Sequence, residues 1–406
     1  MSEIKIINDP VFGFIKIPRG LILDVICHPL MQRLTRIRQL GLASVVYPGA
    51  QHTRFLHSIG AFHLVSEAVL SLQQKGVFIF DSEVEAVQIA ILLHDIGHGP
   101  FSHVLENSLI SGISHEDISL QMMEKMNREM GGALTLAIKI FKNEYSKRFL
   151  HQLISSQLDM DRLDYLRRDS FFTGVTEGNI GSARIIKMLD VENDALVVDQ
   201  KGIYSIENYL ISRRLMYWQV YLHKTAVGCE AILVNLLKRA KYLVRNGHSL
   251  FATPALAYFL ANDVDRDFFT THAEALQNYC SLDDNDIWSS VKVWMNDADP
   301  VLSILANDLV NRKLFKVEVF DEPIPEGVIE ERLAAICTHT GLSTSDATYL
   351  MSANTVNKNM YNMEDDHITI KCKDGTCKDI SQASELFDVT RLSMKNSKYY
   401  LCYQRF

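Results

Sequence analysis

The 406-residue sequence contains no run of about 18 uncharged apolar residues, which is the length that a membrane-crossing helix needs. Its first ten residues also lack the basic-then-apolar pattern of a secretory signal. We therefore expect no membrane association. Internal repeats and low-complexity segments are absent as well, and an apolar content of 47% is that of an ordinary globular protein.

Cysteine is scarce and scattered, with seven residues and no CxxC pair. Such an odd set indicates reduced thiols and a cytoplasmic location, and it argues against a thiolate zinc site. Cys372 and Cys377 flank Asp374-Gly375, a strong hairpin signal. We expect these two thiols to face each other across two strands as a chance reduced pair, with a disulfide as the minor alternative.

Surplus positive charge is also missing, because 41 Lys and Arg residues stand against 49 Asp and Glu residues, for a net charge of −8. A constitutive nucleic-acid surface needs clustered positive charge, so nucleic acid is possible but not the favoured partner. A basic pocket within an acidic protein is compatible with this balance.

Helical periodicity dominates the sequence up to about residue 248. We expect a hairpin over residues 4–17, helices over 30–40 and 55–74, and a long helix over 206–244. A second hairpin is expected to turn at residues 200–202. Strand-like runs then appear at 314–320, 368–373 and 399–403. The predicted fold is mainly α, with a helical core and short β-hairpins at 1–248 and a smaller α+β domain at 249–406. That second domain is expected to serve oligomerisation or regulation.

The stretch richest in chemistry is Leu92 to His103, Leu-Leu-His-Asp-Ile-Gly-His-Gly-Pro-Phe-Ser-His. An apolar run before it indicates a buried helix, which the Gly and Pro residues end. His94 and Asp95 therefore lie at the end of a core helix. A buried imidazole beside a buried carboxylate is costly unless the pair ligates a cation, so the stretch predicts a metal site.

Further polar groups lie in residues 48–58, 115–116 and 158–169. Asp161, Tyr165 and Asp169 share one helix face, whereas Asp164 and Arg168 are expected to form an ordinary surface salt bridge. Two histidines and two aspartates from three helices can surround one cation: His57, His94, Asp95 and Asp161. Nitrogen and oxygen ligands without thiolate suit Mn, Fe, Ni, Zn or Mg, so the metal is not identified.

Each of these signals has a structural explanation when it stands alone. A His-Asp dipeptide marks a site in roughly one case in twenty, and the charged segment 159–169 alone would be a solvated helix face. Arg213, Tyr217 and Lys224 fall within about 40° on one helical wheel, which without other information indicates a solvated basic stripe.

Three segments, taken together and in order, resemble the HD-domain phosphohydrolases, and within them the deoxynucleoside triphosphate triphosphohydrolase branch that includes the SAM-and-HD-domain enzyme. They are Arg54-Phe55-Leu56-His57-Ser58-Ile59-Gly60, His94-Asp95-Ile96-Gly97-His98-Gly99-Pro100-Phe101-Ser102-His103 and Asp161-Arg162-Leu163-Asp164-Tyr165. The resemblance covers about residues 5–245.

The resemblance implies an HD-domain helical core and a set of residue roles. The metal ligands would be His57, His94, Asp95 and Asp161. The catalytic residues would be His115 as general acid, with His98, His103 and Arg54 around the phosphates. The substrate-binding residues would be Gln39, Arg54, Arg162, Tyr165, Asp169, Arg213, Tyr221, His223 and Lys224.

The reaction implied is hydrolysis of a deoxynucleoside triphosphate at the α-phosphorus, which releases a nucleoside and inorganic triphosphate. One alternative is an HD phosphohydrolase acting on nucleoside monophosphates, cyclic nucleotides or another phosphorylated metabolite. A second alternative, of another class, is a nucleotide- or nucleic-acid-binding regulator without turnover.

The sequence departs from guanine-activated relatives at two positions, where Cys27 and Thr35 replace an acidic residue and an arginine. Neither side chain can pair with a guanine edge as the usual groups do, so the resemblance does not establish a need for a nucleotide activator. We also expect a homo-oligomer, a dimer or tetramer. The long helix over 206–244 has more apolar surface than one neighbour should cover.

Overall fold

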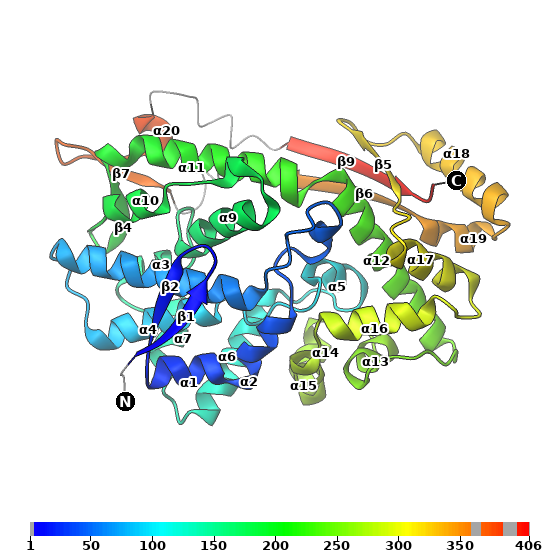
Figure 1. Ribbon diagram of the computed structural model, residues 1–406, viewed down its shortest axis with the longest axis horizontal. Helices are drawn as coiled ribbons and strands as arrows, with labels where there is room; N and C mark the ends of the chain where they lie inside the picture. Colours follow the sequence, from blue (N-terminus) through cyan, green and yellow to red (C-terminus); the bar gives the residue numbers. More distant parts are fainter. Residues whose placement is uncertain (1–3, 359–366, 385–395, 406) are drawn as a thin grey trace.

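The computed structural model describes residues 4–358, 367–384 and 396–405, and these form a mainly helical protein with small sheets (Figure 1). The predicted fold class is therefore confirmed. Up to residue 248 the helices are α1 (Leu21–Cys27), α2 (Pro29–Arg33), α3 (Arg54–Gln74), α4 (Asp81–Leu93), α5 (Ser102–Ser108), α6 (His115–Glu129), α7 (Thr135–Phe141), α8 (Arg148–Gln152), α9 (Met160–Thr173), α10 (Ser182–Met188), α11 (Ile203–Met216) and α12 (Lys224–Arg245).

Beyond residue 248 the helices are α13 (Pro254–Ala261), α14 (Arg266–Thr271), α15 (Ala273–Ser281), α16 (Asp284–Trp294), α17 (Pro300–Val310), α18 (Glu326–Thr340), α19 (Thr344–Ala347) and α20 (Ile380–Ala383). The strands are β1 (Ile4–Asp9), β2 (Gly13–Pro18), β3 (Leu189–Glu192), β4 (Ala195–Asp199), β5 (Lys316–Phe320), β6 (Met351–Lys358), β7 (Thr369–Lys371), β8 (Cys377–Asp379) and β9 (Asn396–Tyr403).

The described strands form three small sheets, in the orders β1-β2, β3-β4-β7-β8 and β5-β9-β6. The sheet β3-β4-β7-β8 crosses the predicted boundary at residue 248, because β4 pairs in parallel with β7. The buried apolar side chains on both sides of residue 248 belong to one cluster. The division into two domains stays a prediction.

The centre of the core is α3, which packs against α4 and α9. Its length and apolar composition would allow it to cross a membrane, but most of its apolar window is buried inside the protein. The side chain of Thr53 caps its first turn by accepting a hydrogen bond from Leu56 N. These contacts bring the polar end of α4 and the first turn of α9 to the first turn of α3.

Several predicted elements differ from the structure. The helix expected over 30–40 ends at Arg36, where the backbone becomes extended and Arg38 pairs with Thr53. The strand β4 pairs with β3, across a turn at Asn193 and Asp194, and residues 200–202 instead lead into α11. Cys377 pairs with Lys371, so it does not face Cys372, although the described cysteines are all free thiols.

The long helix expected over 206–244 is divided. A π-helical turn, Tyr217–Tyr221, ends α11, and α12 starts at Lys224 at an angle of 53° to the preceding segment. A π-helical turn changes the direction in which the following side chains point. Residues before and after it therefore do not share the helix face that a straight α-helix would give.

The loop after α4 is held on two sides. On one side, Gly97 lies so close to α6 that an added Cβ atom would stand 2.2 Å from the His115 carbonyl oxygen. On the other side, the Tyr279 hydroxyl donates a hydrogen bond to the Gly97 carbonyl, and buried Arg33 donates to the carbonyls of His98 and Leu282. Residues on both sides of position 248 thus fix the loop that follows His94 and Asp95.

We expect Gly97→Ala to lower the free energy of unfolding by about 3 kcal/mol, because the methyl group overlaps backbone atoms of α6. Gly327→Ala is the matched control, since no atom lies within 4 Å of its added Cβ and it occupies the first turn of α18. Its stability should be unchanged or slightly higher. Urea unfolding measures both; equal stability of the two variants would contradict the close approach.

Candidate metal centre and active site

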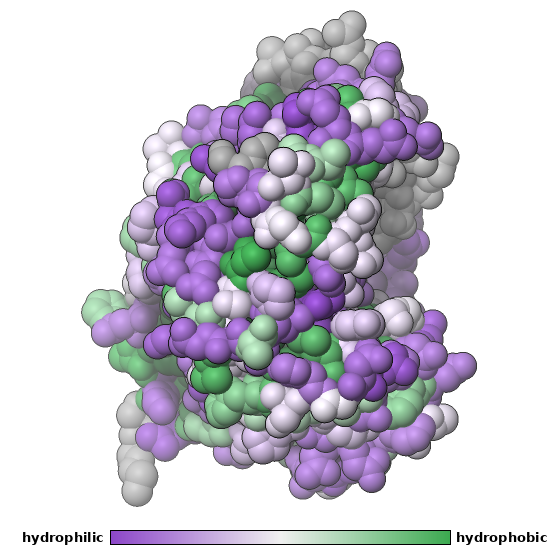
Figure 2. Space-filling view, turned by 90° about the vertical axis from the view of Figure 1, so that its right-hand side faces the viewer, coloured by the Kyte–Doolittle hydropathy of each residue, from purple (hydrophilic) through white to green (hydrophobic). Residues whose placement is uncertain are grey.

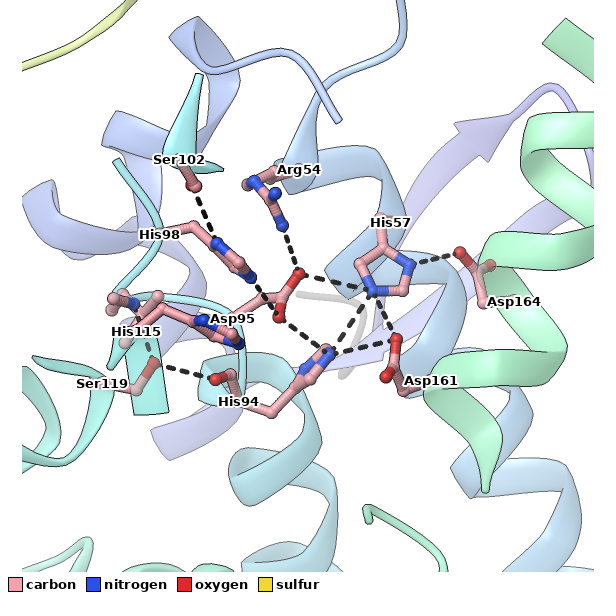
Figure 3. A network of polar contacts seen from close by, with 12 residues as sticks. Arg54, His57, His94, Asp95, His98, Ser102, His115, Ser119, Asp161 and Asp164 are labelled. Atoms are coloured by element: carbon pink, nitrogen blue, oxygen red, sulfur yellow. Dashed lines mark hydrogen bonds and ion pairs between the residues drawn. The ribbon is translucent and has the colours of Figure 1, made fainter. Parts of the chain in front are cut away.

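Three helices bring a cluster of histidine and aspartate side chains together (Figure 3). His57 from α3, His94 after α4 and Asp161 from α9 place their ligating atoms within 4.8 Å of one another. Asp95 lies beside this group, with Oδ1 3.5 Å from His94 Nε2 and Oδ2 3.7 Å from His57 Nε2. The structure thus brings together all four residues that the sequence predicts as metal ligands.

Hydrogen bonds outside the cluster orient both imidazole rings. His57 Nδ1 lies 2.7 Å from Asp164 Oδ2, and His94 Nδ1 lies 2.7 Å from the carbonyl oxygen of Ile91. Both partners are acceptors, so each ring carries a proton on Nδ1 and donates it outward. The two Nε2 atoms lie 3.4 Å apart and both face the cluster.

A cation between these groups fits the arrangement. Burial alone would disfavour a charge on His57, but the hydrogen bonds to Asp161 and Asp164 outweigh it and raise the pKa of His57 to about 10. The cluster therefore stabilises positive charge beside Nε2, which a proton or a divalent metal can supply. Imidazole nitrogens and carboxylate oxygens suit Mn, Fe, Ni, Zn or Mg, and oriented outer hydrogen bonds are typical of metal-ligating histidines.

The spacing of Asp164 and Arg168 predicts a surface salt bridge, and that prediction is wrong. The two side chains do form a salt bridge, but both are fully buried. Asp164 accepts hydrogen bonds from Arg168 Nε and Nη2 at 2.9 Å, besides the one from His57. Arg168 Nη1 in turn donates to Asp9 Oδ2 at 2.8 Å. The pair faces inward because Gly60 of α3 leaves room for it: an added Cβ would lie 2.0 Å from both side chains.

His98 and Arg54 border the cluster on the side of Asp95. Arg54 Nη1 donates to Asp95 Oδ2 at 2.7 Å, and the buried Nε of Arg54 has no partner. His98 Nε2 lies 3.3 Å from Asp95 Oδ1, and its Nδ1 lies 2.8 Å from Ser102 Oγ. Burial, with the nearby charge of Arg54, lowers the pKa of His98 to about 3, so its imidazole is neutral.

His115 stacks on His98 with ring centroids 3.9 Å apart, yet its environment is different. Burial alone would lower the pKa of His115, but Glu106, Glu116 and Asp95 outweigh burial and raise it. Burial disfavours the charge of Glu106 as well, but contacts with His103 and His115 lower the pKa of Glu106 to about 2. The pKa values of the two stacked rings are therefore shifted in opposite directions.

A pocket of about 350 Å³ opens beside the cluster. Its walls include Gln39, Tyr165, Asp169 and Tyr221, together with Arg54, Asp95, His98, His103, His115 and Asp161. Tyr221 donates a hydrogen bond to Asp169 Oδ2 at 2.7 Å, and the buried Oε1 of Gln39 has no partner. The pocket thus presents polar atoms that are free to bind a ligand next to the candidate metal centre.

Four residues expected to bind substrate do not line this pocket: Arg162, Arg213, His223 and Lys224. Arg162 Nε contacts Asp159 at 3.1 Å, and Arg213 Nη1 donates to Gln157. His223 caps α12, because its Nδ1 accepts from Thr225 N.

Lys224 lines a separate pocket of about 530 Å³ with Lys316, Arg332 and Arg405. The π-helical turn and the break before α12 explain why Lys224 does not share a face with Arg213 and Tyr217.

Three further residues at the site have no role indicated by the sequence: Glu106, Asp164 and His52. His52 is buried, its Nε2 lies 2.8 Å from Asp169 Oδ1, and its ring stacks on Phe172. In the sequence, the only indication of a site role for His52 is that it lies two residues before Arg54. That position does not distinguish a site residue from a core histidine.

At the two positions that depart from the activator pattern, neither side chain offers a charge. Cys27 is exposed at the end of α1, and the Thr35 hydroxyl donates to the carbonyl of Gln32. Nearby Arg36 is engaged with Asp283 at 2.5 Å.

Comparison with protein families identifies two consecutive matches. The HD domain matches residues 54–169, which contain the cluster, and the HD associated region matches residues 180–248. The crystal structure of a phosphohydrolase from Bacteroides thetaiotaomicron is similar, with a TM-score of 0.97 and 63% identity over 99% of this chain and 100% of that chain.

Two curated relatives extend the comparison. The uncharacterized protein YwfO of Bacillus subtilis is 30% identical over 96% of this chain and 89% of its own length. The deoxynucleoside triphosphate triphosphohydrolase SAMHD1 homolog of Dictyostelium discoideum is 29% identical over 59% of this chain and 50% of its own length. These matches and the cluster of His57, His94, Asp95 and Asp161 lead to one conclusion. The chain belongs to the HD-domain phosphohydrolases, close to the deoxynucleoside triphosphate triphosphohydrolase branch.

Proposed function

We propose that this HD-domain phosphohydrolase is a metal-dependent hydrolase of deoxynucleoside triphosphates, which releases a nucleoside and inorganic triphosphate. The observation that carries the proposal is the pocket that joins the cluster to Gln39, Tyr165, Asp169 and Tyr221. A hydrolase of small phosphomonoesters would not need this wall of hydroxyl, amide and carboxylate groups. Relatives named deoxynucleoside triphosphate triphosphohydrolase support the same substrate class.

In this proposal His57, His94, Asp95 and Asp161 hold one divalent cation, which supplies Lewis-acid polarisation of a phosphoryl oxygen. Arg54 has a free buried Nε with which to bind phosphate. Asp169 accepts hydrogen bonds from His52 and Tyr221, so it presents only acceptor atoms and suits a sugar hydroxyl. Gln39 and Tyr165 line the same pocket.

Proton transfer in this proposal belongs to His115. Its raised pKa favours the protonated imidazolium form, which can give a proton to the leaving 5′-oxygen when the bond to the α-phosphorus breaks. Neutral His98 orients the phosphate or the attacking water as a hydrogen-bonding group. His103, which is 77% exposed at the pocket mouth, is placed to contact the outer phosphates.

The remaining parts of the proposal concern the setting of the site. The free state of the seven cysteines supports a reducing, cytoplasmic location. A regulatory role for residues 249–406 is supported by the cation-lined pocket of Lys224, Lys316, Arg332 and Arg405, which suits an anionic ligand. Phosphate binding by Arg162, Arg213, His223 and Lys224 would require them to move toward the central pocket.

Incubation of metal-supplemented protein with each deoxynucleoside triphosphate should release inorganic triphosphate, detected by ion chromatography. His94→Ala and Asp95→Ala should each lower the rate by about 100-fold or more, because they remove the site of transition-state charge stabilisation. Each nucleotide is also tested as an activator. Release of phosphate from monophosphates or cyclic nucleotides, without triphosphate, would replace this substrate class with the alternative one.

Glu106→Gln should move the basic limb of the pH–rate profile to lower pH. Glu106 holds the pKa of His115 above its ordinary value, so the general acid of the wild type stays protonated until the pH rises through that raised pKa. Without the carboxylate the pKa of His115 falls, so the loss of activity with rising pH begins at a lower pH than in the wild type. Glu116→Gln is the control, because 62% exposure of the Glu116 side chain weakens its effect. An unchanged basic limb in Glu106→Gln would exclude His115 as the acid.

We also propose a homo-oligomer formed through α11. Tyr204, Ile211 and Leu215 are exposed at spacings of seven and four residues, so they share one face of that helix. The face of the molecule shown in Figure 2 is mostly hydrophilic, with apolar side chains in small separate areas, and is a poorer candidate for the contact between subunits.

Light scattering should give a mass above the 46.1 kDa of one chain. The double variant Ile211→Asp with Leu215→Asp should have a lower mass than the wild type. A concentration-independent monomeric mass would refute this.

A further inference from the structure

A chain of buried charged groups leads from the N-terminal hairpin to the cluster. It begins with Asp9, the last residue of β1, and continues through Arg168 and Asp164 of α9 to His57 of α3. The joining hydrogen bonds are 2.8, 2.9 and 2.7 Å long, and all four side chains have no exposed surface. Figure 3 shows the last of these bonds, in which Asp164 contacts Nδ1 of His57 while Asp161 contacts Nε2 of the same ring.

The charges along this chain alternate. Arg168 lies between two carboxylates and neutralises one of them, so one negative charge remains and faces His57 Nδ1. Burial disfavours that charge, and the two hydrogen bonds that Arg168 donates to Asp164 stabilise it. The ionised carboxylate accepts the Nδ1 proton, which fixes the ring orientation and leaves Nε2 directed at the cluster.

The hairpin is bound rigidly to this chain. The second oxygen of Asp9 accepts hydrogen bonds from Val11 N and Phe12 N and so closes the turn between β1 and β2. The guanidinium of Arg168 lies over the ring of Phe12, with Cζ 5.7 Å from the ring centroid. On the other side, Arg168 and Asp164 pack directly against Gly60 of α3, so that no space remains there for even a methyl group. Movement of the hairpin would therefore move Arg168 and Asp164 with it.

We propose that Asp9, Arg168 and Asp164 are positioning residues that set the metal affinity of the cluster, so that the N-terminal hairpin belongs functionally to the metal site. The proposal rests on the metal-binding part of the proposed function and is independent of the nucleotide substrate. None of the three side chains lines the substrate pocket.

The test is titration of metal-free protein with Mn²⁺, with free Mn²⁺ measured by electron paramagnetic resonance. Asp164→Asn keeps the shape of the side chain and removes its charge, and it should weaken Mn²⁺ binding by about 10- to 100-fold. Asp9→Asn acts two residues further along the chain of charged groups, through Arg168 and Asp164, and should cause a smaller loss. Gly60→Ala changes no charge but displaces both neighbours, and it should also weaken binding.

Asp299→Asn is the matched control. Arg239 bridges Asp299 and Asp346 as Arg168 bridges Asp9 and Asp164, and Asp299 likewise caps a backbone turn. This variant should lower the free energy of unfolding and leave Mn²⁺ affinity unchanged.

Wild-type affinity in Asp164→Asn, or an equal loss in Asp299→Asn, would overturn the proposal. If Asp164→Asn does not fold, unchanged affinity in both Asp9→Asn and Gly60→Ala overturns it. Failure of the wild type to bind Mn²⁺, Fe²⁺, Ni²⁺, Zn²⁺ or Mg²⁺ would overturn the metal site itself. Binding without release of triphosphate would instead contradict only the nucleotide substrate.

Discussion

The hydrogen bond between His57 Nδ1 and Asp164 is the interaction on which the site depends. Through it the first turn of α3 is joined to the middle of α9, and the same carboxylate accepts two hydrogen bonds from Arg168. Burying these charges costs several kcal/mol per ion, which good geometry and complete hydrogen bonding must offset. Removal of one partner would leave the others charged, buried and unpaired. The core of this domain and the geometry of its cluster are therefore stabilised by the same contacts.

The two stacked histidines differ in pKa because their surroundings differ. Both rings lie beside the cluster, with centroids 3.9 Å apart, but His98 is buried next to Arg54, whereas His115 faces Glu106. Burial, together with the nearby guanidinium of Arg54, lowers the pKa of His98, whereas Glu106, Glu116 and Asp95 outweigh burial and raise the pKa of His115. Residue type alone predicts neither shift, since both are histidines.

Much of the fold and the whole cluster could be predicted from the sequence. The start of α3, the end of α4 and the first turn of α9 each carry a local signal, and the HD pattern joins them. The inward orientation of Asp164 and Arg168 could not be predicted, because it depends on the absence of a side chain at Gly60, on another helix. The position of Lys224 depends on a π-helical turn, for which the sequence has no clear signal. The pairing of β4 with β7 joins residues that lie far apart in the chain.

The hydrogen bonds from Tyr279 and Arg33 that hold the loop after α4 determine how much of the chain is needed to keep that loop in place. All four residues of the cluster lie before residue 248, yet the Gly97 carbonyl is held by Tyr279 and the guanidinium of Arg33 is tied to Leu282. A shortened chain ending at the last residue of the HD associated region would retain every proposed ligand and lose these restraints on the loop that carries His98. The two family regions, which end at residue 248, therefore do not include all the residues that hold this loop in place.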